Sequence, residues 1–365
     1  MIEIIPYEDR FEEGIQLLCR IPVSGNIAIS LEREPNYYAG VQIQCEEPEV
    51  FVVYDSAANL IWAVFNIGKR RVWHQNNVVS VRYLSDLRIH PAKQKGSLLL
   101  RISGHFCKLC SQENLPAQTI VFEDNDKMLH VVEKLKQMKG SSNLPFYHFA
   151  GKLITHLFGF KPHYFDKGSY QVRRARTSDI ASMQLFFNVE SSKINYAPYY
   201  DFASLDAPYY QGLQIEDYFL AFQNEQIVGI CGTWNQISIK QTRIVSYSKL
   251  FRKMKPLYNM LARLTGWSKL PQEGSILHTL NLHCIFVSDR NPGIFQSILW
   301  QIATDFKHEN YDYMMCSLSE EDPLIRVFDS VKSRRIKGNY YLVNDGRHIP
   351  DDLKGNLFYI DSARI

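Results

Sequence analysis

The sequence has 365 residues, of which 45% are hydrophobic and 22% are charged, and its formal net charge is +3. This composition is typical of a soluble globular protein and excludes a disordered chain, and so small a charge weighs against a nucleic-acid-binding protein. The chain is long for one hydrophobic core, so we predict two domains.

The first half of the chain alternates short apolar runs with amphipathic segments, which predicts both strands and helices. It begins with a strand at residues 2–5 and a helix at 9–20, followed by an irregular stretch at 21–48. The apolar runs 50–55 and 60–68 are typical of a hairpin, because a short polar turn separates them. The remaining predicted elements are a strand at 78–89, a helix from 98, a strand at 119–123, a helix at 125–138 and an edge strand at 146–160.

A polar stretch containing Pro and Gly, residues 161–169, predicts a linker, and the second half repeats the order of the first. Its predicted elements are a strand at 170–175, a helix to 189, a hairpin at 218–222 and 226–234, a strand at 277–287, a helix at 292–306, a strand at 311–317, a helix at 321–331 and strands at 340–343 and 357–360. We therefore predict an α+β protein with α/β/α layers, in which each half has a mixed, mostly antiparallel central sheet flanked by helices. The predicted domains are residues 1–162 and 170–365, the second with a basic insertion at 236–272.

Seven scattered cysteines, an odd number, are typical of reduced thiols rather than of a disulfide framework. The acidic N-terminus leads directly into a strand, so we expect no signal peptide. No apolar run approaches the roughly 20 residues of a membrane span. We predict a cytoplasmic protein without a transmembrane segment.

The stretch Tyr83–Cys110 joins a strand to a helix through a small basic loop, Pro91–Ser97. The proline ends the strand, Gly96 lets backbone approach a ligand, and Ser97 can cap the helix. The free amides of a helix's first turn and the positive end of its dipole both favour phosphate. The loop therefore predicts an anion site.

This loop resembles the cofactor-binding signature of the GNAT superfamily of acyl-CoA-dependent N-acyltransferases. Ile89-His90-Pro91 matches the strand end, and Lys93-Gln94-Lys95-Gly96-Ser97-Leu98 matches the phosphate loop in part. Lysine stands where arginine or glutamine is usual. Leu98 replaces the second small residue, and we expect its side chain to narrow the phosphate site.

The resemblance implies a GNAT fold in each half and acetyl-CoA or another acyl-CoA as co-substrate, with no metal. The pyrophosphate would bind the amides of Lys93, Gln94, Lys95, Gly96, Ser97 and Leu98. Pantetheine would pair with backbone near Leu87 and Ile89, and Asn125 could contact its amides. The acceptor would be an amine that the resemblance does not specify.

Three further segments are similar to a bacterial group of tandem GNAT-like proteins without a defined substrate. They are Arg33-Glu34-Pro35-Asn36-Tyr37-Tyr38, Tyr83-Leu84-Ser85-Asp86-Leu87-Arg88-Ile89, and Trp234-Asn235-Gln236 with Lys240-Gln241 and Tyr247. We expect the acceptor between the halves or along the side formed by residues 33–44.

Acyl transfer to an amine must remove a proton from the ammonium and return one to the thiolate. The tyrosine that GNAT enzymes commonly use as acid falls on Val132, and the second half offers Phe328. Neither donates a proton. Asp86 and His90 share one face of the predicted strand and are candidates for base or relay, although Asp86 can instead hold Arg88 or a backbone amide.

Two other motifs carry weaker indications. The second-half loop Val287–Ile294 has one basic residue, an aspartate and a proline, which disfavours a polyanion. His105 with Cys107 and Cys110 is compatible with metal or redox chemistry, but the cysteines lie far from the helix start, so core packing is favoured.

The segment 236–272 holds eight basic residues and no acidic one, with apolar residues near helical spacing. An amphipathic basic helix there can bind an acidic partner, such as a CoA 3′-phosphate, a carrier protein or an anionic membrane surface. Alternatively it is an arm whose apolar side covers the groove between the domains.

We therefore predict an acyl-CoA-dependent N-acyltransferase that transfers an acetyl group to an amine. One alternative is a non-catalytic acyl-CoA-binding or interaction module of the same fold. The other is an aminoacyl-tRNA-dependent transferase, which the CoA-type loop of the first half disfavours.

Overall fold

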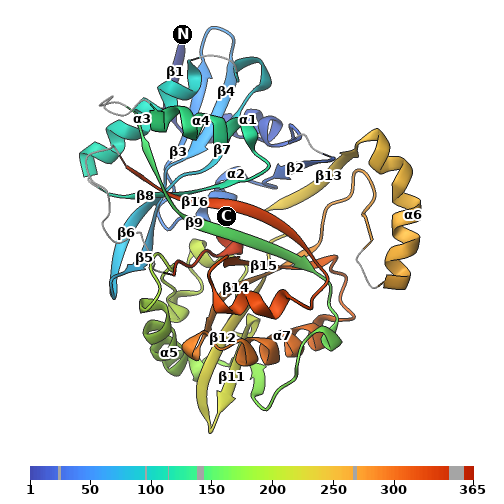
Figure 1. Cartoon of the computed structure of the whole chain (residues 1–365). Helices are drawn as coiled ribbons and strands as arrows, with labels where there is room; N and C mark the ends of the chain where they lie inside the picture. The colour runs from blue at the N-terminus through green and yellow to red at the C-terminus, as the bar shows by residue number, and fades with distance from the viewer. Residues whose placement is uncertain (24–25, 95–96, 114, 138–143, 266–268, 345–356) are drawn as a thin grey trace.

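The computed structural model describes all residues except 24–25, 95–96, 114, 138–143, 266–268 and 345–356. Two halves lie one above the other in Figure 1, and a long curved sheet runs through both. The strands of this ten-stranded sheet are, in spatial order, β10 (Gln171–Arg174), β11 (Tyr218–Gln223), β12 (Gln226–Asn235), β14 (Thr279–Val287), β15 (Tyr313–Ser319), β9 (Phe146–Phe158), β16 (Ser333–Asn344), β8 (Ala117–Phe122), β6 (Asn77–Tyr83) and β5 (Lys69–His74).

The two halves exchange strands across the centre of this sheet. β9, from the first half, pairs with β15 and β16 of the second, and β16 in turn pairs with β8 of the first. The edge position predicted for residues 146–160 is therefore wrong, because β9 has a neighbour on each side. Its long apolar run reflects burial between two partners.

A second sheet of four strands covers the N-terminal end of the molecule. Its order is β1 (Ile2–Pro6), β3 (Val50–Asp55), β4 (Leu60–Asn66) and β7 (Ser85–Ile89). The single strand predicted at 78–89 is thus two strands in two sheets, β6 and β7, which meet at Leu84. The Leu84 amide still donates to the Gln118 carbonyl at 2.9 Å, but from Ser85 onward the chain pairs with β4.

Helices flank the sheets, but the helix predicted at 321–331 is wrong, because only the short 3-10 helix Pro323–Phe328 forms there. The α-helices are α1 (Glu12–Cys19), α2 (Tyr37–Gln42), α3 (Leu98–Glu113), α4 (Asp126–Gln137), α5 (Ile180–Ser192), α6 (Lys249–Thr265) and α7 (Pro292–Phe306). In α3, Leu98, Ile102 and Phe106 recur at i, i+4 and i+8 and face the core. At the start of α7, Asn291 accepts the Gly293 amide at 2.8 Å and Pro292 occupies the first position, which fixes the start of that helix.

The segment predicted to be irregular, residues 21–48, contains β2 (Ile27–Glu32) and α2, so that prediction is wrong. β2 pairs with β13 (Gln241–Tyr247) of the second half in a separate two-stranded sheet. From β13 the chain enters α6, which stands away from the body of the molecule (Figure 1). The pairing with a segment more than 200 residues away explains why local pattern alone did not reveal β2.

The predicted fold class, α+β with helices flanking a mixed sheet, is confirmed. The domain boundaries, 1–162 and 170–365, remain a prediction. Within the described part of the chain, no helix is long and apolar enough to cross a bilayer.

Candidate functional site

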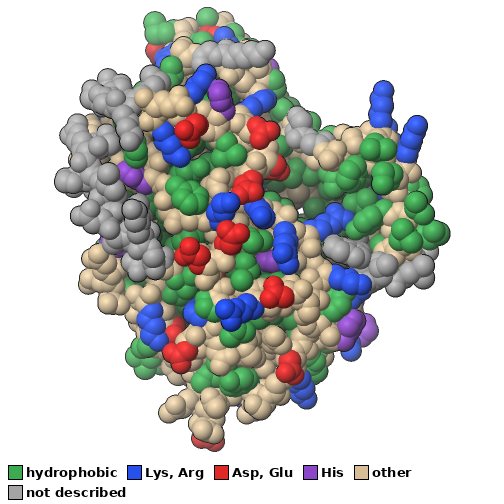
Figure 2. All heavy atoms as spheres, in the orientation of Figure 1, with side chains coloured by type: hydrophobic (Ala, Val, Ile, Leu, Met, Phe, Trp, Pro, Cys, Tyr) green, Lys and Arg blue, Asp and Glu red, His purple; other side chains and the backbone are tan. Residues whose placement is uncertain are grey.

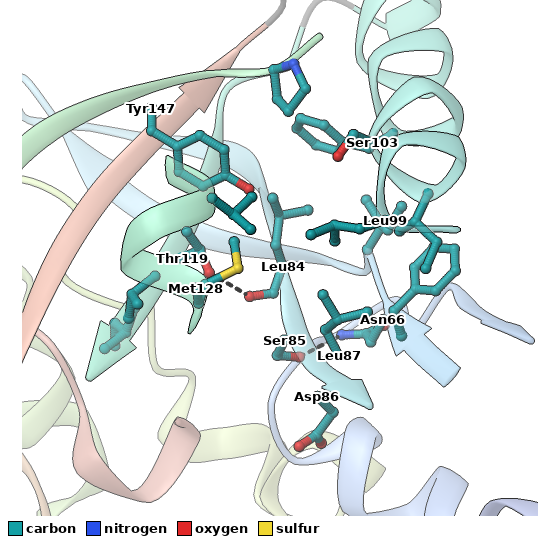
Figure 3. Close-up of a pocket in the computed structure, with 18 of the residues that line it drawn as sticks. Asn66, Leu84, Ser85, Asp86, Leu87, Leu99, Ser103, Thr119, Met128 and Tyr147 are labelled. Atoms are coloured by element: carbon teal, nitrogen blue, oxygen red, sulfur yellow. Dashed lines mark hydrogen bonds between the residues drawn. The ribbon is translucent and has the colours of Figure 1, made fainter. Parts of the chain in front are cut away.

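A pocket of about 210 Å³ opens where β7 leaves β8, between α3 and α4 (Figure 3). The last link between the two strands is the bond from Thr119 Oγ1 to the Leu84 carbonyl, at 3.0 Å. Beyond it, β7 pairs with β4 and β8 pairs with β16, so in the described part of the chain no strand pairs with the sides of β7 and β8 that face the gap. The apolar lining includes Phe65, Ile67, Leu84, Leu99, Ile102, Phe106, Val121, Met128 and Val131.

The predicted phosphate loop lies between β7 and α3, and all but Lys95 and Gly96 of its predicted residues are described. The ammonium of Lys93 lies 4.8 Å from the centre of the Trp62 ring. Gln94 donates to the Ile89 carbonyl at 3.1 Å and accepts from Lys127 of α4 at 2.9 Å. Gln94 therefore links β7 to α4.

α3 begins directly after the loop. The Ser97 carbonyl accepts the Arg101 amide at 3.0 Å, and α3 begins at Leu98. The Leu98 side chain is buried in the core with Ile102 and Phe106. The expected narrowing of the phosphate site by this leucine is therefore wrong, because the side chain points into the protein.

Of the residues expected near pantetheine, Leu87 and Asn125 line the pocket, whereas Ile89 does not. The Leu87 side chain lines it and is 37% exposed, whereas Ile89 pairs with Ala63 of β4. Asn125 also lines the pocket, and its Oδ1 accepts the Met128 amide at 3.2 Å, which caps α4.

Asp86 lies on β7 at a bulge, with φ of 52°. Its carboxylate is buried and accepts two hydrogen bonds from Arg33, at 2.9 and 3.1 Å. Burial alone would raise the pKa of Asp86, but the positive charges of Arg33, Arg88 and Lys240 outweigh it and hold the pKa below its usual value. Asp86 is thus an ionised partner of Arg33, and a carboxylate held in this way is a weak base.

His90 is partly buried at the other end of β7. Its Nδ1 accepts the Ala92 amide at 3.3 Å, and its ring meets the Trp62 ring edge-on at 5.3 Å between centres. The imidazole therefore caps the short 3-10 helix Pro91–Lys93.

Lys240, expected only as part of the basic segment 236–272 and of the signature Lys240-Gln241, belongs to the ionic group around Asp86. Its Nζ donates to the Ile365 carbonyl at 2.5 Å, and the charges of both Arg33 and Asp86 act on it. Burial, assisted by the positive charge of Arg33, lowers the pKa of Lys240 to about 7. At physiological pH this lysine therefore exists in both its charged and its neutral form.

Tyr147 of β9 is a residue without a predicted role. Its side chain is buried and lines the pocket, at the end opposite Asp86 (Figure 3). Its hydroxyl makes no hydrogen bond to any described residue, and burial raises its pKa, so it remains a protonated donor. Val132, which occupies the position expected for the GNAT tyrosine, is buried in the core.

The second half repeats the bulge but fills the equivalent gap. Cys284 of β14 has φ of 50°, as Asp86 does on β7, and β14 separates from β15 after Asn281. The Tyr359 hydroxyl accepts the Ile285 amide at 2.9 Å, and Ser362 donates to the Leu282 carbonyl at 3.0 Å. Tyr359 and Ser362 of the C-terminal segment thus form hydrogen bonds with backbone groups of β14. The corresponding side of β7 faces the open pocket.

The basic residue of the loop after β14, Arg290, is already engaged within the protein. Arg290 forms an ion pair with Asp322 and donates to the Ile285 carbonyl at 2.7 Å. Cys107 and Cys110 lie on α3, and both are buried in the core. The described residues contain no group of three His, Cys, Asp or Glu side chains arranged to hold a metal.

The site thus combines an open gap between two splayed strands with a helix N-terminus beside it, and the two halves exchange strands. No protein-family model and no curated protein matches the sequence. Among solved structures, the chain is similar to a GCN5-related N-acetyltransferase of Anabaena variabilis, at 10% identity and a TM-score of 0.53 over 94% of this chain and 72% of that one. It is also similar to Saccharomyces cerevisiae N-myristoyltransferase with bound myristoyl-CoA, at 8% identity and a TM-score of 0.60 over 94% and 78%. At identities this low, the structural similarity shows a shared fold and nothing more.

Proposed function

We propose that the protein is an acyl-CoA-dependent N-acyltransferase with one acyl-CoA site per chain. The observation that supports this most directly is the pocket between β7 and β8, which combines unpaired strand backbone, an apolar lining and the start of α3. The backbone suits the amides of pantetheine, the apolar lining suits an acyl chain, and the amides of the first turn of α3 suit a phosphate. The filled gap of the second half favours a single site.

We assign the acceptor to the end of the pocket that Asp86 lines, and Arg33 and Lys240 lie buried near Asp86 behind that lining. The amine nitrogen attacks the thioester carbonyl carbon, an amide bond forms, and the carbon–sulfur bond breaks. Lys240 does not line the pocket, so its neutral form takes up the proton that the ammonium loses through an intervening water, and the thiolate takes up a proton from solvent. The Arg33–Asp86 pair fixes the bulge of β7 and so positions the backbone that holds the thioester.

We expect Leu87→Trp to weaken acyl-CoA binding at least roughly tenfold, because the larger side chain fills the pocket. Leu87 lines the pocket and is partly exposed, so the variant can fold. Leu100→Trp is the matched control, since Leu100 is exposed on α3 and does not line the pocket. Calorimetric titration with acetyl-CoA and with longer acyl-CoAs measures both.

Three outcomes separate the alternatives. Loss of binding in Leu87→Trp alone, with transfer to an amine by the unchanged protein, supports the enzyme. Binding without release of free thiol, across a broad set of amines, leaves a non-catalytic acyl-CoA-binding module. Absence of binding at millimolar ligand contradicts the proposed site and leaves the aminoacyl-tRNA-dependent reading.

A further inference from the structure

Helix α6 presents three distinct faces. One face packs against the protein, where Phe251 and Tyr258 contact a small apolar cluster that contains Ile244, Tyr247 and Leu270. Arg334 of β16 donates to the Tyr258 hydroxyl at 3.0 Å, which ties the helix to the large sheet. The helix is therefore held in place by its inner side, and its other faces are available.

The second face is an exposed apolar row. Leu250, Met254, Leu257 and Leu261 follow one another at i, i+4, i+7 and i+11, and 65%, 54%, 55% and 46% of their surfaces are exposed. Such spacing places all four side chains on one stripe of the helix. The sequence analysis offered an arm whose apolar side covers the groove between the domains. Such an arm explains the inner face of α6, but it does not explain the exposed apolar row.

The third face is basic and borders the apolar row. Lys249 and Lys253 form no ion pair with any described residue, while Arg252 is paired with Glu273 at 2.9 Å. The segment 236–272 contains no acidic residue that could neutralise these lysines locally. Figure 2 shows hydrophobic side chains covering the outer side of α6, with Lys and Arg side chains projecting beside them.

We propose that α6 is an interfacial helix that binds the surface of an anionic lipid bilayer. A straight row of long apolar side chains on a helix that stands away from the body can enter the boundary between headgroups and acyl chains along its whole length. The lysines beside the row lie at the level of the lipid phosphates, where each contributes to binding. This inference does not depend on the proposed acyltransferase activity.

Other occupants fit these observations less well. An apolar partner helix would be bound best by a groove, but the row is a convex ridge on a single helix. A second copy facing the same ridge would bring two sets of unpaired lysines together, which disfavours the contact. A bilayer meets both the apolar row and the lysines at once.

The test is co-sedimentation of the full chain with vesicles of phosphatidylcholine containing phosphatidylglycerol, compared with vesicles of pure phosphatidylcholine. We expect binding to the anionic vesicles, weakened by salt. The double variant L250S/L257S should lower the partition coefficient at least tenfold, since it removes two inserted apolar side chains. The double variant K249Q/K253Q should lower it roughly 25-fold, about fivefold for each lysine.

The matched control is L185S/V189S on α5, because Leu185 and Val189 are as exposed as Leu250 and Leu257 and lie one turn apart. It should bind vesicles as the unchanged protein does. An equal loss in this control, no sedimentation with anionic vesicles, or equal binding to both kinds of vesicle overturns the proposal. Poly-glutamate binding without vesicle binding would assign the face to an acidic protein. Self-association abolished by L250S/L257S, again without vesicle binding, would assign it to a second copy.

Discussion

Replacing Arg33 by methionine is expected to lower the free energy of unfolding by about 3–5 kcal/mol. The reason is that Arg33 and Asp86 are both buried, with 5% and 9% of their side chains exposed, and share two hydrogen bonds. Methionine keeps much of the packing volume but leaves the Asp86 carboxylate charged and without its main partner. Urea unfolding followed by circular dichroism measures the loss.

Two further variants distinguish loss of the ion pair from loss of packing. The double variant Arg33→Met with Asp86→Asn should be more stable than Arg33→Met alone, because it removes the unpaired buried charge. The matched control is Arg20→Met, which breaks the pair with Glu34 at the surface and should leave stability nearly unchanged. An Arg33→Met variant as stable as the Arg20→Met control would contradict the role given to this pair.

The same pair sets a pH dependence. Because the folded protein holds the pKa of Asp86 below its unfolded value, the pair stabilises the fold above the unfolded pKa, near 4, and this contribution is lost as the pH falls through the folded value. The unchanged protein should therefore lose stability in acid more steeply than the double variant does. Parallel curves for the two proteins would show that Asp86 is not linked to folding.

Elements whose pattern is local were predictable from the sequence. The helix at residues 292–306 and the strand at 50–55 match α7 and β3, because a proline after a capping asparagine marks the first and a polar turn bounds the second. α6 was also expected, from its basic residues and helical spacing. In each case neighbouring residues alone specify the structure.

Pairing between distant segments was not predictable. The sequence of Phe146–Phe158 predicts an apolar strand, but it does not indicate whether the strand lies at an edge or at the centre of a sheet. Only the structure shows that it lies between β15 and β16. The break at Leu84 is equally hidden, because residues on both sides of it favour strand. The break arises because the chain pairs with β8 up to Tyr83 and with β4 from Ser85 onward, and both partners are distant in the sequence.

The candidate site shows the same limit. The loop after β7 was recognisable because its residues are contiguous. Lys240 and Tyr147 were not expected at the site, because each reaches the pocket region from an element far along the chain. The available signal for Lys240 was its place in the basic segment 236–272, and this does not reveal which charges surround the ammonium in the fold.

Lys240→Met is expected to reduce acyl transfer by about 100- to 10,000-fold, the range associated with removal of a general base. Acyl-CoA affinity should be unchanged, because Lys240 does not line the pocket. Release of free thiol from acyl-CoA, in the presence of an accepted amine, measures turnover. Lys152→Met is the control, since Lys152 is exposed and pairs only with Glu123.

The pH profile separates a base from a structural lysine. Burial and the Arg33 charge lower the pKa of Lys240 to about 7, so the amine is protonated and inactive as a base below that pH and becomes neutral above it. Turnover should rise with pH and reach half its maximum near pH 7, and Lys240→Met should lose this dependence together with its activity. Lys240→Arg should not restore turnover, because a guanidinium stays protonated throughout this range. Full turnover in Lys240→Met, or an unchanged profile in the residual activity, would leave Lys240 a structural partner of the Ile365 carbonyl.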